Sequence, residues 1–276
     1  MTLRTALLQG IQLLEEAAVA VPRLTAEVLL SHAVGCGRVY LYAHPEQELR
    51  EVEWLHYGRY LHQRMQGKPT QYITKRQEFY GREFRVTPDV LIPRPETEHV
   101  VEVALALARG ARRIVDVGTG SGALAVTMQL ETGAAAIATD LSFAATAVAA
   151  GNAQSLGARV DFVVCDLLSG IADRSVDLIV SNPPYVPLGD RHGLQREVRD
   201  WEPHVALFAG ETGFELYQRI VADGPRVLRP GGWLVMELGF GSLNHVTGLL
   251  EGWSEIRVEP DLAGMPRVIA AMGTGK

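Results

Sequence analysis

The sequence predicts an α/β protein with a doubly wound, mostly parallel seven-stranded sheet, preceded by a small helical domain and a β-hairpin linker. Three observations support this fold class. From about residue 113 onward, short apolar runs rich in β-branched residues alternate with helical segments. A glycine-rich turn follows the first of these runs. The first 66 residues have helical periodicity throughout.

The N-terminal region has the pattern of a small helical bundle. Pro22 begins a second helix that ends near Gly35, and residues 46–65 form a third that Gly67 and the residues after it terminate. In the first helix, apolar side chains share one face; they are Leu3, Leu7, Ile11 and Leu14. In the third helix, the apolar positions are Leu49, Val52, Leu55 and Leu61. We expect a helical domain over residues 1–70.

In residues 72–92 the side-chain pattern changes to a period of two, which is typical of β-strands. Within this stretch, the pattern of residues 78–86 predicts a hairpin with its turn near Gly81. We assign residues 71–92 to a linker and residues 93–276 to the larger domain, in which Pro95 begins a helix. The expected strands of that domain are 113–117, 135–139, 160–165, 176–181, 232–238, 254–258 and 267–271. The expected helices between them are 121–130, 143–155, 213–228 and 243–250.

Composition narrows the class of protein. An apolar fraction of 47% suits a globular core, and no apolar stretch is long enough to cross a bilayer. The N-terminus lacks the pattern of a signal peptide. The two cysteines, Cys36 and Cys165, are far apart in the sequence and provide neither a disulfide framework nor a zinc site. We therefore expect a soluble, cytoplasmic protein with no metal site and no membrane association.

The charge is unevenly distributed along the chain. Residues 1–85 carry 11 Lys+Arg against 9 Asp+Glu, whereas residues 86–276 carry 15 against 23. Binding to duplex DNA depends mainly on cationic side chains at phosphates. The acidic larger domain argues against nucleic acid as the principal partner.

The turn after the first strand has the spacing Gly-x-Gly-x-Gly, formed by Gly118, Thr119, Gly120, Ser121 and Gly122. Glycines there let the backbone pass close to a ligand, and the following helix offers free amide donors. Asp116, just ahead of the turn, would repel a pyrophosphate but suits a cationic or zwitterionic ligand. S-adenosyl-L-methionine, with a sulfonium and an ammonium group, is such a ligand.

Acidic residues also follow the next two strands. Asp140 has the spacing at which a carboxylate holds both ribose hydroxyls; the alternative is the N-cap of the next helix, and the two roles are compatible. Asp166 or Leu167, after the third strand, would border an adenine ring; the alternative for Asp166 is a solvated loop carboxylate.

The fourth strand runs directly into Asn182, Pro183, Pro184 and Tyr185. Two prolines remove backbone donors and keep the chain extended, so a side-chain amide and a free carbonyl lie side by side. Together they can accept both hydrogens of an –NH2 group, and Tyr185 adds a flat face. The alternative is a strand end with an Asn turn. The following segment, residues 186–212, has 27 residues and is longer than a simple connecting loop in a compact domain. Its length suggests a lid over the substrate.

The combination of Asp-x-Gly-x-Gly-x-Gly with Asn-Pro-Pro-Tyr resembles class I S-adenosylmethionine-dependent methyltransferases that act on planar amino groups. Within that class, the sequence is similar to one family, the bacterial release factor glutamine methyltransferases. The similar stretches are residues 78–81, 91–98, 198–204 and 261–264, and the helical domain and the hairpin also match. The resemblance covers nearly the whole chain. One departure is Leu167, where some members have an aromatic residue, and another is Met265-Pro266 in place of polar residues.

This resemblance implies methylation of the glutamine amide in the Gly-Gly-Gln motif of peptide chain release factors, with S-adenosyl-L-homocysteine as the second product. It implies that the glycine turn, Asp140 and Asn182 bind the cofactor, that residues 182–185 hold the glutamine, and that residues 1–70 recognise the substrate. Three alternatives remain open: adenine N6 methylation of DNA, glutamine methylation of a ribosomal protein, and a non-catalytic role in translation. A DNA enzyme would be expected to carry a basic target-recognition region.

Overall fold

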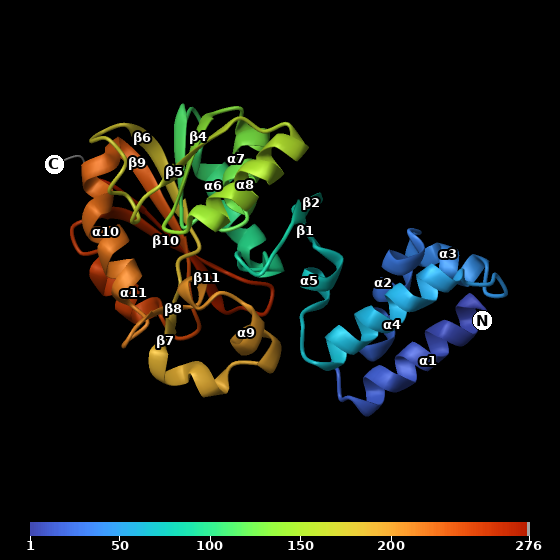
Figure 1. Ribbon diagram of the computed structural model, residues 1–276. Coiled ribbons are helices and arrows are strands. Elements are labelled where there is room, and N and C mark those ends of the chain that lie inside the picture. The colour runs from blue at the N-terminus through green and yellow to red at the C-terminus, as the bar shows by residue number, and fades with distance from the viewer. Residues whose placement is uncertain (275–276) are drawn as a thin grey trace. The chain divides into compact units, whose positions relative to one another are not determined.

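The computed structural model describes residues 1–274, and its chain divides into two compact units (Figure 1). The helical unit contains Met1–Arg76 together with Gln195–Trp201. The sheet unit contains Gln77–Leu194 and the chain from Glu202 onward. Within the described residues, no helix combines the length and the apolar character needed to span a membrane.

The helical unit is built from six helices in the described chain: α1 (Leu3–Glu16), α2 (Pro22–Val34), α3 (Arg38–Ala43), α4 (Glu51–Met65), α5 (Thr70–Thr74) and α9 (Arg196–Trp201). The Thr2 hydroxyl caps α1 by accepting the backbone N–H of Thr5. α2 ends where Gly35 takes a positive φ of 75°. The predicted apolar face of α1 is confirmed, because all four of its residues are buried.

The predicted apolar face of the third helix was wrong in part. α4 begins at Glu51, where Glu53 and Arg50 form a capping box, and both Val52 and Leu55 are exposed. The buried face instead contains Tyr57 and Leu61. A Cβ on Gly10 of α1 would lie 1.8 Å from the Tyr57 hydroxyl, so close packing against α1 selects this face.

Three short helices of this unit were not predicted: α3, α5 and α9. α3 follows Gly37, and α5 occupies the beginning of the stretch that had been predicted to have a period of two. α9 joins this unit through an ion pair of 2.7 Å between Arg64 and Glu197. In addition, the Lys68 ammonium lies 5.8 Å from the centre of the Trp201 ring.

The hairpin prediction is confirmed. β1 (Arg76–Phe79) and β2 (Arg82–Arg85) flank the two-residue turn Tyr80-Gly81, where both residues have positive φ, 51° and 69°. Such a turn matches the right-handed twist of the strands it connects. Phe79 and Phe84 are buried in a hydrophobic core of the sheet unit.

The predicted seven-stranded sheet is also confirmed. Its strand order is β10-β11-β9-β6-β3-β4-β5, and only β11 runs opposite to the others. The bounds are β3 (Arg113–Val117), β4 (Ala135–Asp140), β5 (Val160–Val164), β6 (Val176–Ser181), β9 (Leu228–Glu237), β10 (Ser254–Pro260) and β11 (Pro266–Met272).

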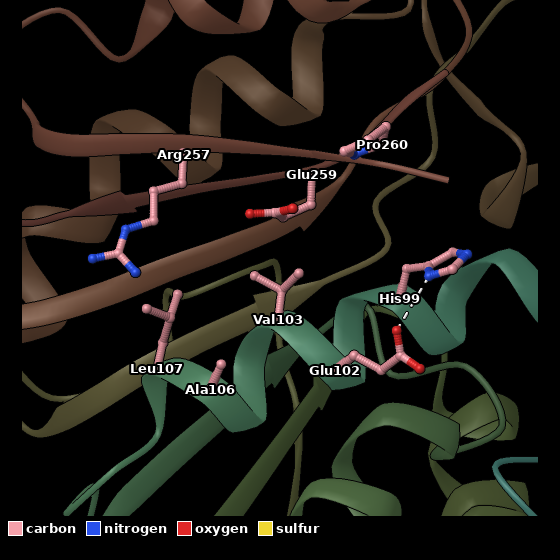
Figure 2. A pocket seen from close by; sticks show the side chains of 8 residues that line it. All are labelled: His99, Glu102, Val103, Ala106, Leu107, Arg257, Glu259 and Pro260. Atoms are coloured by element: carbon pink, nitrogen blue, oxygen red, sulfur yellow. Dashed lines mark hydrogen bonds and ion pairs between the residues drawn. The ribbon is translucent and has the colours of Figure 1, made fainter. Parts of the chain in front are cut away.

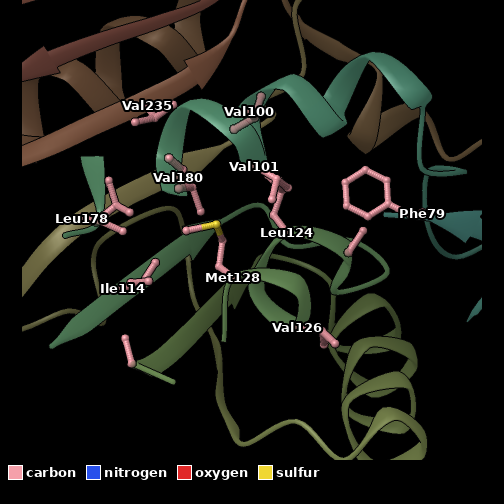
Figure 3. Close-up of a cluster of buried hydrophobic side chains, with 14 of the residues drawn as sticks. Phe79, Val100, Val101, Ile114, Leu124, Val126, Met128, Leu178, Val180 and Val235 are labelled. Carbon is pink, nitrogen blue, oxygen red and sulfur yellow. The ribbon is translucent and has the colours of Figure 1, made fainter. Parts of the chain in front are cut away.

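Helices cover both faces of this sheet (Figure 1). They are η1 (Pro95–Thr97), α6 (Glu98–Leu107), α7 (Ala123–Thr132), α8 (Phe143–Leu156), α10 (Glu215–Val227) and α11 (Leu243–Leu249). In Figure 3, Leu178 and Val180 of β6 face α6 and α7, while Ile179 belongs to the core beneath α10 and α11. This two-sided burial explains why residues 178–180 of β6 are all apolar.

Between β6 and α10 lies an insertion of short elements. They are β7 (Val186–Pro187), η2 (Leu188–Gly193), α9, η3 (His204–Ala206) and β8 (Phe208–Gly210). β7 and β8 pair in parallel as a two-stranded ribbon. The insertion therefore has a structure of its own, and contributes one helix to the other unit.

Candidate functional site

A cavity lies at the carboxyl ends of β3, β4, β5 and β6, where ligands bind in doubly wound sheets. Residues from all four strand ends line it, together with Val205 and Phe208 of the insertion and Arg219 of α10. The sequence-predicted site residues on its wall are Gly118, Gly120, Asp140, Asp166, Leu167, Asn182 and Pro184. Side chains far apart in the sequence are thus brought together.

The glycine turn leaves space on the cavity side. Gly118 and Gly120 have positive φ of 73° and 54°, and a Cβ added at either would meet no atom within 4 Å. Gly122 serves a different purpose, because its Cβ would come within 3.1 Å of the Ala149 side chain in α8. The first two glycines therefore leave room for a ligand, and the third allows α7 and α8 to approach.

Asp116 stabilises the glycine turn through hydrogen bonds and is not among the residues that line the cavity. One oxygen, Oδ2, accepts from the Thr119 hydroxyl at 2.6 Å and from the Ala125 N–H at 3.1 Å. The other oxygen is buried and has no hydrogen-bond partner among the described residues. Burial raises the pKa of Asp116 to about 7. Thr119 and Ser121 are likewise buried within the turn.

Asp140 faces the cavity and closes the turn. Its two carboxylate oxygens accept the backbone N–H groups of Gly120 at 2.9 Å and of Ser142 at 2.8 Å. The N-cap of α8 is Ser142, whose hydroxyl accepts from Ala145. The helix-cap alternative for Asp140 was therefore wrong, and this carboxylate is held at the cavity with lone pairs to spare.

Asp166 and Leu167 border the cavity next to Asp140. Asp166 forms an ion pair of 2.6 Å with Arg219, and both side chains are half exposed. Leu167 has a φ of 50°, a conformation that is rare and strained for a non-glycine residue. Arg219 was not predicted from the sequence, because helical periodicity alone does not show which α10 residue reaches the sheet edge.

The end of β6 places the Asn-Pro-Pro-Tyr segment at the same edge. The Ser181 hydroxyl donates to the Val117 carbonyl at 2.7 Å, and the ladders of β6 stop at Ser181. Asn182 and Pro184 line the cavity, whereas Pro183 and Tyr185 are not among its lining residues. Burial raises the pKa of Tyr185 to about 12, so its phenol stays neutral.

Asn182 is held by two residues that are not in the predicted site. Its Nδ2 donates to the Thr97 hydroxyl at 3.0 Å, and that hydroxyl donates to Oε2 of Glu237 at 2.5 Å. Thr97 is buried and absent from the cavity lining. Glu237 ends β9, the strand that pairs with β6. An acidic residue near the end of an expected strand was the signal in the sequence, but the sequence did not show that this strand lies beside β6.

A second pocket lies between α6 and β10 (Figure 2). Its lining combines Glu102 and Glu259 with Arg257 and His99, and it includes none of the predicted site residues. The Arg257 guanidinium also lies 4.8 Å from the centre of the Trp233 ring. Among residues 1–274, no group of three or more His, Cys, Asp and Glu side chains is placed to hold a metal ion.

The strand order and the cavity at the carboxyl ends define a Rossmann-like methyltransferase domain, and residues 100–194 match the family model described as Methyltransferase small domain. Residues 5–74 match the model described as PrmC N-terminal domain. The chain is 45% identical to the release factor glutamine methyltransferase of Koribacter versatilis, over 98% of both chains. The corresponding Nitratidesulfovibrio vulgaris protein is 41% identical, over 98% of this chain and 95% of its own.

This chain therefore belongs to the release factor glutamine methyltransferase family, and the predicted family and enzyme class are confirmed. The fold also resembles that of a 16S rRNA methyltransferase from T. thermophilus, solved in complex with AdoMet and guanosine. The TM-score is 0.53 at 19% sequence identity, and the match covers 72% of this chain and 49% of the other.

Proposed function

We propose that this protein transfers a methyl group from S-adenosyl-L-methionine to the side-chain amide nitrogen of the glutamine in the Gly-Gly-Gln motif of peptide chain release factors, leaving S-adenosyl-L-homocysteine. The observation that carries this proposal is the near-full-length relationship to release factor glutamine methyltransferases. It includes the helical region, which other methyltransferases of this fold need not share. The protein would act in the cytoplasm, where translation takes place.

The cavity fits this cofactor. The open space over Gly118 and Gly120 would accept the amino-acid part, and the carboxylate of Asp140 would accept both ribose hydroxyls. Leu167 would border the adenine, with the Asp166 carboxylate at the rim. Asp116, with Thr119, Ser121 and Gly122, would contribute by holding the turn in place. The cofactor supplies an electrophilic methyl group on a sulfonium.

The Asn-Pro-Pro-Tyr segment would orient the substrate amide. An amide nitrogen is a poor nucleophile because its lone pair is delocalised into the carbonyl. Oδ1 of Asn182 and the carbonyl of Pro183 would accept its two hydrogens and raise the electron density on nitrogen. The nitrogen–carbon bond then forms as the sulfur–carbon bond breaks, and the nitrogen loses a proton to water. Holding the reacting atoms about 3–3.5 Å apart contributes on the order of 7–11 kcal/mol. Pro184, which lines the cavity, would form the adjoining wall. Tyr185, the next residue along the chain, would pack beside the amide.

Recognition of the protein substrate would come from residues 1–70, with the hairpin of residues 71–92 as linker and residues 93–276 as catalytic domain. The strong negative charge of the larger domain disfavours DNA, as does the relationship to enzymes named for release factors. The same relationship favours a release factor over a ribosomal protein as substrate.

The test is to incubate the protein with methyl-labelled S-adenosylmethionine and, separately, with a release factor, its Gln-to-Ala variant, ribosomal proteins and duplex DNA. We expect label in the release factor alone. Asn182→Ala should bind S-adenosylhomocysteine normally but turn over about 10²-fold more slowly. Label in DNA or in ribosomal proteins, with none in the release factor, would contradict the proposal.

A further inference from the structure

Three polar side chains are linked by hydrogen bonds from the cavity wall inward: Asn182, which lines the cavity, and the buried Thr97 and Glu237. Asn182 stands at the end of β6, Thr97 in η1, and Glu237 at the end of β9. The distances are 3.0 Å from Asn182 Nδ2 to Thr97 Oγ1 and 2.5 Å from Thr97 Oγ1 to Glu237 Oε2. Thr97 is 5% exposed and Glu237 is 2% exposed, so water does not compete for these contacts.

The donors and acceptors of these three side chains fix the direction of the two hydrogen bonds between them. A carboxylate only accepts hydrogen bonds, and a threonine hydroxyl has one proton to donate. Once that proton is directed at Glu237, Thr97 Oγ1 presents lone pairs to Asn182. Lone pairs attract the –NH2 end of the amide and repel its oxygen. A flipped amide would bring two oxygens together.

We propose that Thr97 and Glu237 are positioning residues that fix the side-chain amide of Asn182 with its oxygen toward the substrate nitrogen. This inference rests on the proposed function, because it assigns Oδ1 of Asn182 the task of accepting a substrate hydrogen. The wrong flip would offer an –NH2 group to another –NH2 group. Neither Thr97 nor Glu237 reaches the cavity, so both act only through Asn182.

Glu237 is itself held rigidly. Its backbone carbonyl accepts the buried Tyr217 hydroxyl at 2.8 Å, and β9 pairs it with Val268 of β11. A backbone fixed by these contacts suits a residue that sets an orientation. The burial of an acidic side chain here is costly, which an ordinary core position would avoid by being apolar.

The experiment compares Thr97→Val, Thr97→Ser and Glu237→Gln with the wild type, using release-factor methylation and S-adenosylhomocysteine binding. Valine keeps the shape of threonine and removes the hydroxyl, while serine keeps the hydroxyl. We expect Thr97→Val to lower kcat by about 10²-fold with a KM and an S-adenosylhomocysteine affinity within about twofold of wild type. Thr97→Ser should keep kcat within about threefold.

A double variant, Thr97→Val with Glu237→Gln, should be no slower than Thr97→Val alone, because both residues act on one group. Equal losses in the valine and serine variants, or wild-type kcat in Thr97→Val, would overturn the inference. A loss of kcat in the double variant that equals the product of the two single-variant losses would also overturn the inference.

A direct readout separates this inference from the proposed substrate. In 15N-labelled protein, the side-chain –NH2 signal of Asn182, assigned by its disappearance in Asn182→Asp, should exchange slowly with solvent in the wild type and rapidly in Thr97→Val. If the wild type does not methylate a release factor, the proposed function is wrong. The exchange rate of the Asn182 –NH2 signal would still show whether Thr97 fixes the orientation of the amide. An unchanged exchange rate in Thr97→Val would refute the positioning role.

Discussion

Gly239 lies against the ring of Tyr185 so closely that a Cβ at this glycine would be 2.7 Å from the tyrosine Cδ2. A Cβ on Gly213 would likewise be 2.7 Å from the Tyr185 carbonyl oxygen. Two glycines, from the end of β9 and the start of α10, therefore leave the space in which the Asn-Pro-Pro-Tyr segment is seated.

Gly239→Ala should displace Tyr185 and reduce turnover at least about tenfold, while overpacking costs about 1–3 kcal/mol of stability. Methylation kinetics and thermal unfolding measure the two effects. Gly248→Ala is the matched control, since a Cβ at that helical glycine meets nothing within 4 Å. The control should be as active as wild type and no less stable. Wild-type turnover in Gly239→Ala would show that the ring position does not matter.

The rate of methylation should fall as the pH drops through about 7. Burial raises the pKa of Glu237 to about 7, and protonation would remove the acceptor-only group that directs the Thr97 hydroxyl. The other charged groups near this carboxyl are Arg267, Glu96 and Arg94. In Glu237→Gln, kcat should be lower and should no longer decline over this range.

Asp116 titrates in the same range, and Asp116→Asn is therefore the control for the pH profile. It should retain the acidic decline in rate if Glu237 is the responsible group. A decline that persists unchanged in Glu237→Gln would assign it elsewhere.

Asp116 should also make stability depend on pH. Its pKa is raised from 3.8 to about 7 in the fold, so the folded state holds a proton that the unfolded chain has already released. The protein should therefore lose stability as pH rises from about 4 to 7, by roughly 4 kcal/mol from this group. Asp116→Asn should lack that loss, so its Tm relative to wild type should rise with pH. Parallel Tm curves for the two proteins would contradict this account.

The ion pair between Arg64 and Glu197 should contribute measurably to the helical unit, because Arg64 is buried. Glu197→Ala would leave the guanidinium unpaired and cost about 1–3 kcal/mol in the free energy of unfolding by urea. Glu46→Ala breaks a pair of similar length with Arg4, but both of those side chains are largely exposed. Its cost should stay below about 1 kcal/mol. Equal effects would mean that burial does not strengthen the Arg64 pair.

The sheet could be predicted from the sequence almost strand by strand, because its central strands are buried on both faces and are rich in apolar, β-branched residues, as in β6. The α4 face could not, because its register is set by the Tyr57–Gly10 contact with another helix. Local spacing placed Asp140 and Asn182 at one edge. The contact of Asn182 with Thr97, and of Thr97 with Glu237, could not be predicted in this way, because it depends on which strands are neighbours in the sheet.

One helix of six residues within the long β6–α10 insertion has a consequence for how this protein can be divided. Because α9 is bound to the helical unit, the polypeptide crosses between the two units three times, after Arg76, Leu194 and Trp201. Removing the first 76 residues would leave Glu197 and Trp201 without the Arg64 and Lys68 contacts that secure them. The polypeptide therefore connects the two units three times rather than once, and neither unit can be excised with a single cut.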